Sequence, residues 1–515
     1  AAVHARAADG VGGEWLLDPL EIVIGTGAPA VSPPFPFGGS NASAPSFIAP
    51  ALVETALNAG GNVTIKTSGP ATAPGPNESH IRVAEPITMT GASAATLKLV
   101  AHGDIQVDGV AITSTGGPLN LDFQAGYAFD AAANSTTGGS VFLQSGTTLG
   151  SNGGSVLLQA NAPSPNTGVH LNGAVINAGA GAVSVVANAI LDSAIKLENS
   201  QISAGSVLFS GNVSAGGDYG VYLANSSLTT SGAINLGSTA SRVKLVGSTL
   251  ISGGGSITLS AKGVADAGHT SSLALVSSSP PAPVSTTIQT TGAGTITLTG
   301  ELTGGGVSAP SVSAGVLVDG ATVTTGGGAL TVNGKSGVAP SPGVTGPTLG
   351  VRVAASGSLG AGSGALSITG ETGNSSGPDS VGVALDGTAT ANSITVVGTA
   401  SNPSQSSLTG ISVKGTLSAA NNLSLNGTIS GQSGKGVDVA AGATVNSGAG
   451  GLAIQGSATS GSTSAAVEGI SISGAVTSSG PITATGVVSV PVGNTAAIHG
   501  LSLMAAGQIT ATGTG

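Results

Sequence analysis

The sequence predicts an all-β protein whose chain winds into a parallel β-helix, or β-solenoid, of about fifteen coils after a short N-terminal segment that does not repeat. Composition supports this class. Gly supplies 87 of 515 residues, aromatic residues make up 2% and charged residues 7%, so a thick core of large side chains cannot form. The chain is still 40% hydrophobic, which argues against disorder. The third observation is an internal repeat.

The repeat consists of two apolar phrases that recur about every 30 residues. The first phrase has the form Gly-Val-x-Leu and begins at Gly168, Ala194, Gly220, Arg242, Ser272, Gly315, Gly350, Gly382, Gly410, Gly436, Gly469 and Gly500. The second has the form Ile/Leu-Thr/Ser-apolar and begins at Ile257, Ile296, Leu330, Leu366, Leu423 and Ile482. A short alternating pair often lies between them, which gives three strands per unit.

Three such strands cannot bury an apolar face alone, so copies must stack into three parallel sheets around a narrow interior. Gly and Asn suit the tight corners because they tolerate positive φ. The alternation predicts which side chains of the first phrase point inward: Val169, Leu171, Ile195, Leu197, Val221, Leu223, Val316, Val318, Val383, Leu385, Val437 and Val439.

We divide the chain into an N-terminal segment, residues 1–80, and a β-helix, residues 81–515. The N-terminal segment is rich in Pro. It contains one expected helix, Pro50–Asn58, which Pro50 can begin and Gly60 can end, followed by a strand over residues 63–67.

Two phrases of this segment carry a resemblance. The run from Gly12 to Pro19, with Trp15 and Asp18, and the stretch from Ser46 through Glu54 and Asn58 to Ile65 are similar to filamentous-haemagglutinin-like exoproteins, the large adhesins of bacterial two-partner secretion. The resemblance by phrase covers residues 12–68, and the remainder matches in repeat style. It implies a right-handed parallel β-helix, export through an outer-membrane secretion transporter, and adhesion at the bacterial cell surface. In the family a secretion domain precedes the phrase that holds Trp15, and we expect no match to that domain within residues 1–14.

Charge and composition exclude several classes. The net charge of −10 argues against nucleic-acid binding, and no apolar stretch is long enough for a transmembrane helix. We expect no cofactor and no catalysis. Cys is absent, and the six His residues show no metal-ligand spacing.

One candidate ligand-binding strip follows from the middle residue of successive first phrases: His170, Lys196, Tyr222 and Lys244. Stacked one coil apart, they would form a cationic column with one aromatic ring, which suits an acidic polysaccharide. The alternative is a solvated sheet face whose Lys residues discourage edge pairing.

Acidic residues give weaker candidates. Asp319 and Asp386 hold one turn position two coils apart, a separation compatible with paired carboxylates of an inverting glycosidase. The alternative is that Asp-Gly simply suits a turn, with Lys414 as an ion-pair partner for Asp386. Asp104 and Asp108 suggest a calcium site, but the motif does not recur in each coil.

Nine Asn-x-Ser/Thr sequons are candidate glycosylation sites, since some adhesins that this chain resembles are N-glucosylated; they lie at Asn41, Asn62, Asn77, Asn134, Asn212, Asn225, Asn374, Asn422 and Asn426.

The leading functional expectation is the shaft of a secreted or cell-surface adhesin, or a filament component, that contacts host or bacterial glycans or proteins and supports aggregation or biofilm formation. One alternative is a β-helical protein that binds or degrades polysaccharide, although no aromatic residue follows Tyr222. Another is ice binding through an outward column that includes Thr258, Thr297 and Thr331, although we expect Gly in the neighbouring column.

Loops and chain ends complete the expectations. Length variation should fall after the last strand of each unit, at residues 334–347, 370–380, 398–407, 456–465 and 486–496, so that the loops line one edge and carry lateral contacts. The chain begins without Met, and its repeat runs to the end without a polar cap. We expect either a segment of a longer chain or an open coil that docks onto another copy, giving self-association into fibres.

Overall fold

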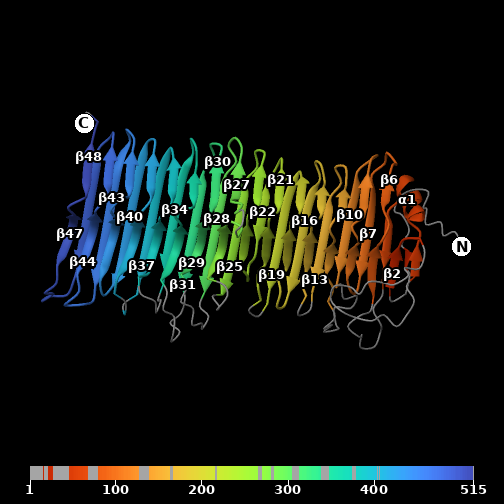
Figure 1. Cartoon of the computed structure of the whole chain (residues 1–515), viewed down its shortest axis with the longest axis horizontal. Coiled ribbons are helices and arrows are strands. Elements are labelled where there is room, and N and C mark those ends of the chain that lie inside the picture. Colours follow the sequence, from red (N-terminus) through yellow and green to blue (C-terminus); the bar gives the residue numbers. More distant parts are fainter. Residues whose placement is uncertain are drawn as a thin grey trace. The chain divides into compact units, whose positions relative to one another are not determined.

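The computed structural model describes residues 15–16, 21–26, 46–67, 79–126, 138–162, 166–214, 217–264, 270–279, 283–303, 312–337, 347–373, 379–402, 404 and 406–513. The chain forms two compact units, Ala1–Ser238 and Thr239–Gly515. Within each unit the strands lie side by side in three parallel sheets, here called A, B and C (Figure 1). The chain visits the sheets in the order B, C, A in each coil.

In the first unit, sheet A consists of β1 (Trp15–Leu16), β4 (Val63–Lys66), β7 (Ala95–Ala101), β10 (Leu119–Ala125), β13 (Val156–Asn161), β16 (Ala182–Ala189), β19 (Ser206–Val213) and β22 (Ile234–Gly237). Sheet B consists of β2 (Glu21–Ile24), β3 (Ser46–Ile48), β5 (His80–Val83), β8 (Ile105–Val107), β11 (Val141–Leu143), β14 (Val169–Asn172), β17 (Ile195–Glu198) and β20 (Val221–Ala224). Sheet C consists of β6 (Ile87–Met89), β9 (Ala111–Ser114), β12 (Thr148–Gly150), β15 (Val175–Asn177), β18 (Gln201–Ala204) and β21 (Ser227–Thr230).

In the second unit, sheet A consists of β25 (Ile257–Val264), β28 (Ile296–Thr303), β31 (Leu330–Gly337), β34 (Ala365–Thr372), β37 (Ser393–Ser401), β40 (Asn422–Gly431), β43 (Gly451–Ser460) and β46 (Ile482–Ser489). Sheet B consists of β23 (Val243–Val246), β26 (Ser271–Val276), β29 (Ser313–Asp319), β32 (Thr348–Val353), β35 (Val381–Leu385), β38 (Leu408–Val413), β41 (Gly434–Val439), β44 (Val467–Ile472) and β47 (Ile498–Leu503). Sheet C consists of β24 (Thr249–Ser252), β27 (Thr286–Thr290), β30 (Ala321–Thr325), β33 (Ser358–Gly360), β36 (Thr388–Ala391), β39 (Thr416–Ala419), β42 (Thr444–Ser447), β45 (Ala475–Ser478) and β48 (Gln508–Ala511).

This architecture is a parallel β-helix and confirms the predicted fold class. Counted over both units, sheet C contains 15 described strands, one per coil, in agreement with the expected number of coils. The inward residues are also as predicted. All twelve side chains, from Val169 to Val439, are buried, and the pairs Val169↔Ile195 and Ile195↔Val221 stack in one ladder.

The predicted helix is α1 (Pro50–Asn58), with Pro50 in its first turn and with Val53 and Leu57 buried. It lies at the edge of sheet C beside β6 (Figure 1). The N-terminal segment is not separate from the sheets, because β1 pairs with β4 in sheet A and β2 pairs with β5 in sheet B.

Two side chains of α1 cover the open edge of β6. The Thr88 N–H donates to Glu54 Oε1 at 2.8 Å. The N–H groups of Thr90 and Gly91 donate to Asn58 Oδ1 at 2.6 and 3.0 Å. The helix therefore supplies the acceptors that a preceding strand would otherwise provide, which protects an edge that could pair with another chain.

Glycine has two roles, of which the sequence analysis anticipated one. At the corner between sheets B and C, Gly173, Asn199 and Asn225 have positive φ of 63°, 51° and 49°, as predicted for tight corners. The glycines that open the first phrase in the second unit, such as Gly350 and Gly436, serve another purpose, because φ there is not positive.

These glycines allow two sheets to touch. In sheet A, Gly334, Gly370, Gly398, Gly427 and Gly456 pair in register from strand to strand. Each lies against the backbone carbonyl of a sheet B glycine, as Gly427 does against Gly436, so a Cβ at these positions would overlap that carbonyl. The contact brings backbone against backbone and excludes any side chain there.

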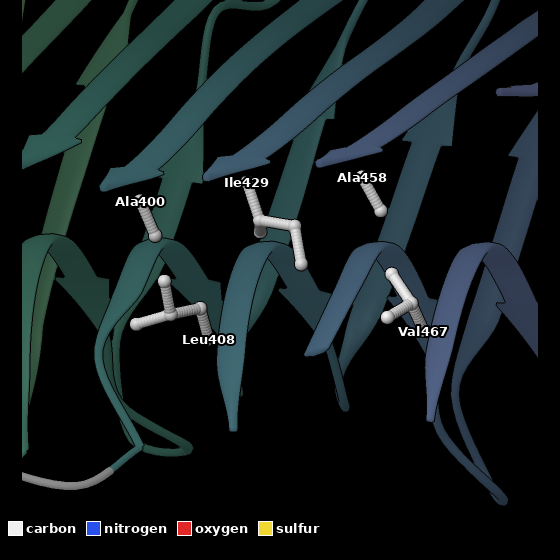
Figure 2. Packing of buried hydrophobic residues seen from close by; sticks show 5 residues of the cluster. All are labelled: Ala400, Leu408, Ile429, Ala458 and Val467. Atoms are coloured by element: carbon white, nitrogen blue, oxygen red, sulfur yellow. The ribbon is translucent and has the colours of Figure 1, made fainter. Parts of the chain in front are cut away.

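Beyond this contact the two sheets enclose a second apolar strip. Ala400, Ile429 and Ala458 from sheet A meet Leu408 and Val467 from sheet B (Figure 2). The sheet A strands therefore run further than the sequence analysis expected. Residues 334–337, 370–372, 398–401, 456–460 and 486–489, assigned to loops, belong to β31, β34, β37, β43 and β46.

The connections of variable length do follow sheet A, as predicted. Between β40 and β41 only residues 432–433 intervene, whereas residues 490–497 separate β46 from β47. Parts of the expected loops, residues 338–346, 374–378, 403 and 405, lie outside the described residues.

Candidate functional site

The outer face of sheet B in the first unit brings together most of the predicted strip. Successive strands pair Arg82, Gln106, Phe142, His170, Lys196 and Tyr222 in one column. Lys244 occupies the corresponding position of β23 in the second unit, where it pairs with Ala274. A neighbouring position, two residues along the strand, holds Glu198, which the sequence analysis did not single out.

Glu198 changes the electrostatics of the strip. Its Oε2 accepts a hydrogen bond from His170 Nε2 at 2.9 Å and lies 3.2 Å from Lys196 Nζ. One carboxylate thus contacts two of the four residues of the predicted strip. Within the first unit, the charge of Lys196 is therefore balanced by its neighbour, a feature that the sequence analysis did not anticipate.

The pKa values agree with this geometry. Burial lowers the pKa of His170 below its ordinary value of 6.5, against the opposing hydrogen bond to Glu198, so the ring is neutral near pH 7. Burial alone would raise the pKa of Glu198, but hydrogen bonds and charge from His170 and Lys196 outweigh it and lower that pKa. Burial, followed by the Glu198 charge, raises the pKa of Tyr222.

Aromatic rings flank this polar centre. The rings of Tyr219 and Tyr222 stack with centroids 5.3 Å apart and planes at 26°. On the other side, the Phe142 and His170 rings meet at 5.0 Å and 57°. We call Phe142, His170, Lys196, Glu198, Tyr219 and Tyr222 the sheet B patch. It combines aromatic faces with donors and acceptors, the combination that holds a sugar ring by stacking and hydrogen bonding.

The acidic candidates are engaged in structural contacts. Asp319 Oδ1 accepts a hydrogen bond from Ser356 Oγ at 2.7 Å. Asp386 lies 3.9 Å from Arg352 Nε of the preceding sheet B strand, so its ion-pair partner is Arg352 rather than the expected Lys414. Each carboxylate therefore has its own local partner, as the turn interpretation expects.

Asp104 and Asp108 are likewise engaged in ion pairs and hydrogen bonds within the fold. Asp108 pairs with Arg82 and accepts a hydrogen bond from Gln106 Nε2 at 2.6 Å. Asp104 accepts one from the Ser140 N–H at 2.7 Å and lies 3.4 Å from His80 Nδ1; burial raises its pKa. Across the described ranges, no group of three or more His, Asp or Glu side chains is placed to hold a metal ion.

The sequons fall in different settings. Asn41, Asn77, Asn134 and Asn374 lie outside the described residues. Asn225 is a corner residue with positive φ, and Asn212 Oδ1 accepts a hydrogen bond from Ser238 Oγ at 3.3 Å. Asn422 and Asn426 lie on the exposed side of β40, and Asn62 precedes β4.

The Thr column considered for ice binding is confirmed in register within the second unit, from Thr258 through Thr297 and Thr331 to Thr483. The expectation of Gly beside it is wrong. The neighbouring outward positions are Ser260, Thr299, Asn333, Thr369, Val397, Asn426, Gln455 and Thr485, because the glycines lie one residue further, on the inward side.

Comparison with known proteins gives no match: no family model matches the chain, and no curated protein is significantly similar to it. Among the residues that the structure describes, no helix is long and apolar enough to cross a membrane.

Proposed function

We propose that this protein is the adhesive shaft of a bacterial exoprotein, displayed at the cell surface or secreted, and that the sheet B patch binds saccharide on a partner surface. The observation that carries the proposal is the patch itself, in which two aromatic pairs flank the Glu198 hydrogen bonds. The resemblance of residues 12–68 to filamentous-haemagglutinin-like exoproteins supports the setting, including export through an outer-membrane transporter.

A stack of parallel coils suits this role. Each coil contacts only its neighbours, so a stack can display side chains repeatedly along one face without altering the interior. The proposal assigns no reaction to the patch. Glu198 is its single carboxylate and is already hydrogen-bonded to His170, whereas glycoside hydrolysis ordinarily needs two carboxylates about the scissile bond.

The patch should prefer neutral saccharides to acidic ones, because Lys196 is balanced by Glu198 and His170 is neutral near pH 7. Binding of the purified chain to arrays of immobilised neutral and acidic oligosaccharides tests this. Replacement Tyr222→Ala should weaken binding about fivefold, since an aromatic stacking contact is worth about 1 kcal/mol.

Leu208→Ala is the matched control, because Leu208 is an exposed apolar side chain on the outer face of sheet A in the same unit. Binding that Leu208→Ala weakens as much as Tyr222→Ala would refute the assignment of the patch. Binding to no saccharide of either class would refute the proposed function.

A further inference from the structure

His170 is the member of the sheet B patch whose charge can change between neutral and mildly acidic solution. An imidazole ordinarily titrates near neutral pH, whereas carboxylates, phenols and ammonium groups titrate well outside this range. The His170 side chain is 15% exposed, so solvent can supply the proton. The patch therefore has two charge states, which differ in the ligands that they suit.

The contact with Glu198 decides which nitrogen of the ring takes up the additional proton. An ionised carboxylate only accepts hydrogen bonds, so His170 Nε2, 2.9 Å from Glu198 Oε2, carries a hydrogen in the neutral ring. The second proton is then added at Nδ1. The hydrogen bond to Glu198 persists in both states, so protonation changes the charge of the patch without breaking the contact that orients the ring.

Charged groups approach His170 from β17 and from the connection before it. Lys196 and Glu198 lie on β17, the strand that pairs with β14, and the connection contributes Asp192. Strands β11, β13 and β16, which also contact β14, contain no titratable residue. While the imidazole is neutral, the two carboxylates and the one ammonium group leave one unbalanced negative charge around it.

Both carboxylates are held in place, so they cannot turn away from an incoming anion. Asp192 Oδ2 accepts a hydrogen bond from Thr167 Oγ1 at 2.5 Å, and its Oδ1 accepts one from the Ser193 N–H at 2.7 Å. Burial alone would raise the pKa of Glu198, but the contacts with His170 and Lys196 lower it, so this group stays ionised in mild acid. An acidic saccharide therefore meets an uncompensated repulsion while His170 is neutral.

We propose that the sheet B patch admits acidic saccharides as a second class of ligand once the His170 imidazole gains a proton. The added charge cancels the unbalanced negative charge, and the new Nδ1–H group is a further charged donor for an anionic ligand. Neutral saccharides are affected little, because stacking on the Tyr219 and Tyr222 rings does not depend on this charge. The inference rests on the proposed function, since it extends the ligands of the same patch.

The direction of the pH dependence follows from the surroundings of the ring. Burial lowers the pKa of His170 below its ordinary value, against the hydrogen bond to Glu198, so the proton is taken up only in acid. The affinity for acidic saccharides should therefore be low near pH 7 and rise as the pH falls through the pKa of His170. By linkage, a bound acidic saccharide should raise that pKa, whereas a bound neutral saccharide should not.

The test titrates His170 by NMR in the full chain and measures binding about one pH unit above and below its midpoint. The probes are immobilised acidic and neutral oligosaccharides, among them an oligogalacturonate and its uncharged methyl ester as a pair that differs in charge. Affinity for the acidic probes should rise about tenfold at the lower pH, and affinity for the neutral probes should change by less than about twofold.

Two variants assign the effect to His170. His170→Gln retains an Nε2 donor for Glu198 but cannot gain a proton, so it should lose the pH response. His499→Gln, which replaces an exposed imidazole of β47 in the second unit, is the matched control and should keep that response. The readout is the ratio of affinities at the two pH values, which a uniform weakening of binding does not change.

Circular dichroism of each variant at both pH values establishes that the β-helix is intact. Neutral probes that bind while the affinity for acidic probes fails to rise in acid would overturn this inference and leave the proposed function standing. The same rise in His170→Gln would assign the proton to another group and also overturn it. Binding to neither class of probe at either pH would overturn the proposed function and this inference together.

Discussion

Adding one methyl group where the two sheets touch should destabilise the coil that carries it. In Gly427→Ala the new Cβ would overlap the carbonyl oxygen of Gly436 and lie 2.7 Å from its carbon and 2.8 Å from Val437 Cγ2. Gly427 lacks positive φ, so the backbone conformation itself accepts Ala. The destabilising contribution therefore comes from the forced separation of β40 and β41.

The magnitude follows from two opposing contributions. Overpacking costs about 1–3 kcal/mol, and the upper end applies because the obstacle is a backbone carbonyl and not a flexible side chain. Replacing Gly by Ala restricts the unfolded chain and returns about 0.4–1 kcal/mol. The expected net destabilisation is about 2 kcal/mol. In Gly461→Ala nothing lies within 4 Å of the new Cβ, so only the stabilising contribution remains.

Hydrogen exchange measured by mass spectrometry is the appropriate assay, since long repeat arrays unfold locally and not as one two-state unit. Amides of β40 and β41 should exchange about thirtyfold faster in Gly427→Ala, the equivalent of about 2 kcal/mol. Gly461→Ala should show no acceleration. Equal protection in the two variants would refute the close contact as the reason for glycine at these positions.

Three further results are expected. Val383→Asp buries an unpaired charge and should lower the free energy of unfolding by several kcal/mol. Thr390→Asp, on the exposed side of the next strand, should change it by less than about 0.5 kcal/mol. Equal thermal stability of the two variants would show that the inward register is wrong. Glu198→Gln should lower the NMR-measured pKa of His170 still further, because the carboxylate raises that pKa; an unchanged titration would contradict the hydrogen bond. Asn58→Ala removes the acceptor of two N–H groups at the solvent-exposed edge of sheet C, which should cost about 0.5–1.5 kcal/mol, and should increase exchange of the Thr90 and Gly91 amides while Leu52→Ala, on the exposed side of α1, does not.

The repeat and its alternation predicted the order of the strands, the inward residues and the corner glycines, because each of these depends on a short stretch of chain. The facing glycines of sheets A and B could not be interpreted in the same way. Gly427 and Gly436 belong to consecutive strands, and their contact depends on how two sheets close on each other, which periodicity does not specify.

The repeat likewise predicted some residues of the candidate site and missed others. The column of His170, Lys196 and Tyr222 followed from the repeat, since equivalent positions of successive coils must be neighbours. Glu198 stood two residues from Lys196 in the printed sequence, and a search of the neighbouring outward position in each strand would have found it. Tyr219 lies just before β20 in the connection that precedes it, where no repeat position applies.

The helix α1 also bears on how the chain folds. Parallel strands form slowly because each pairing closes a long loop before any contact compensates the lost entropy. The acceptors on Glu54 and Asn58 bind backbone N–H groups 34 and 32 residues ahead, and because α1 precedes every strand of sheet C, it can align β6 before any other strand of that sheet exists. The first coil then becomes a nucleus, and each later coil needs only to dock on the one before it. We therefore expect the first unit to fold with a direction, from α1 onward, in the order in which the chain is synthesised.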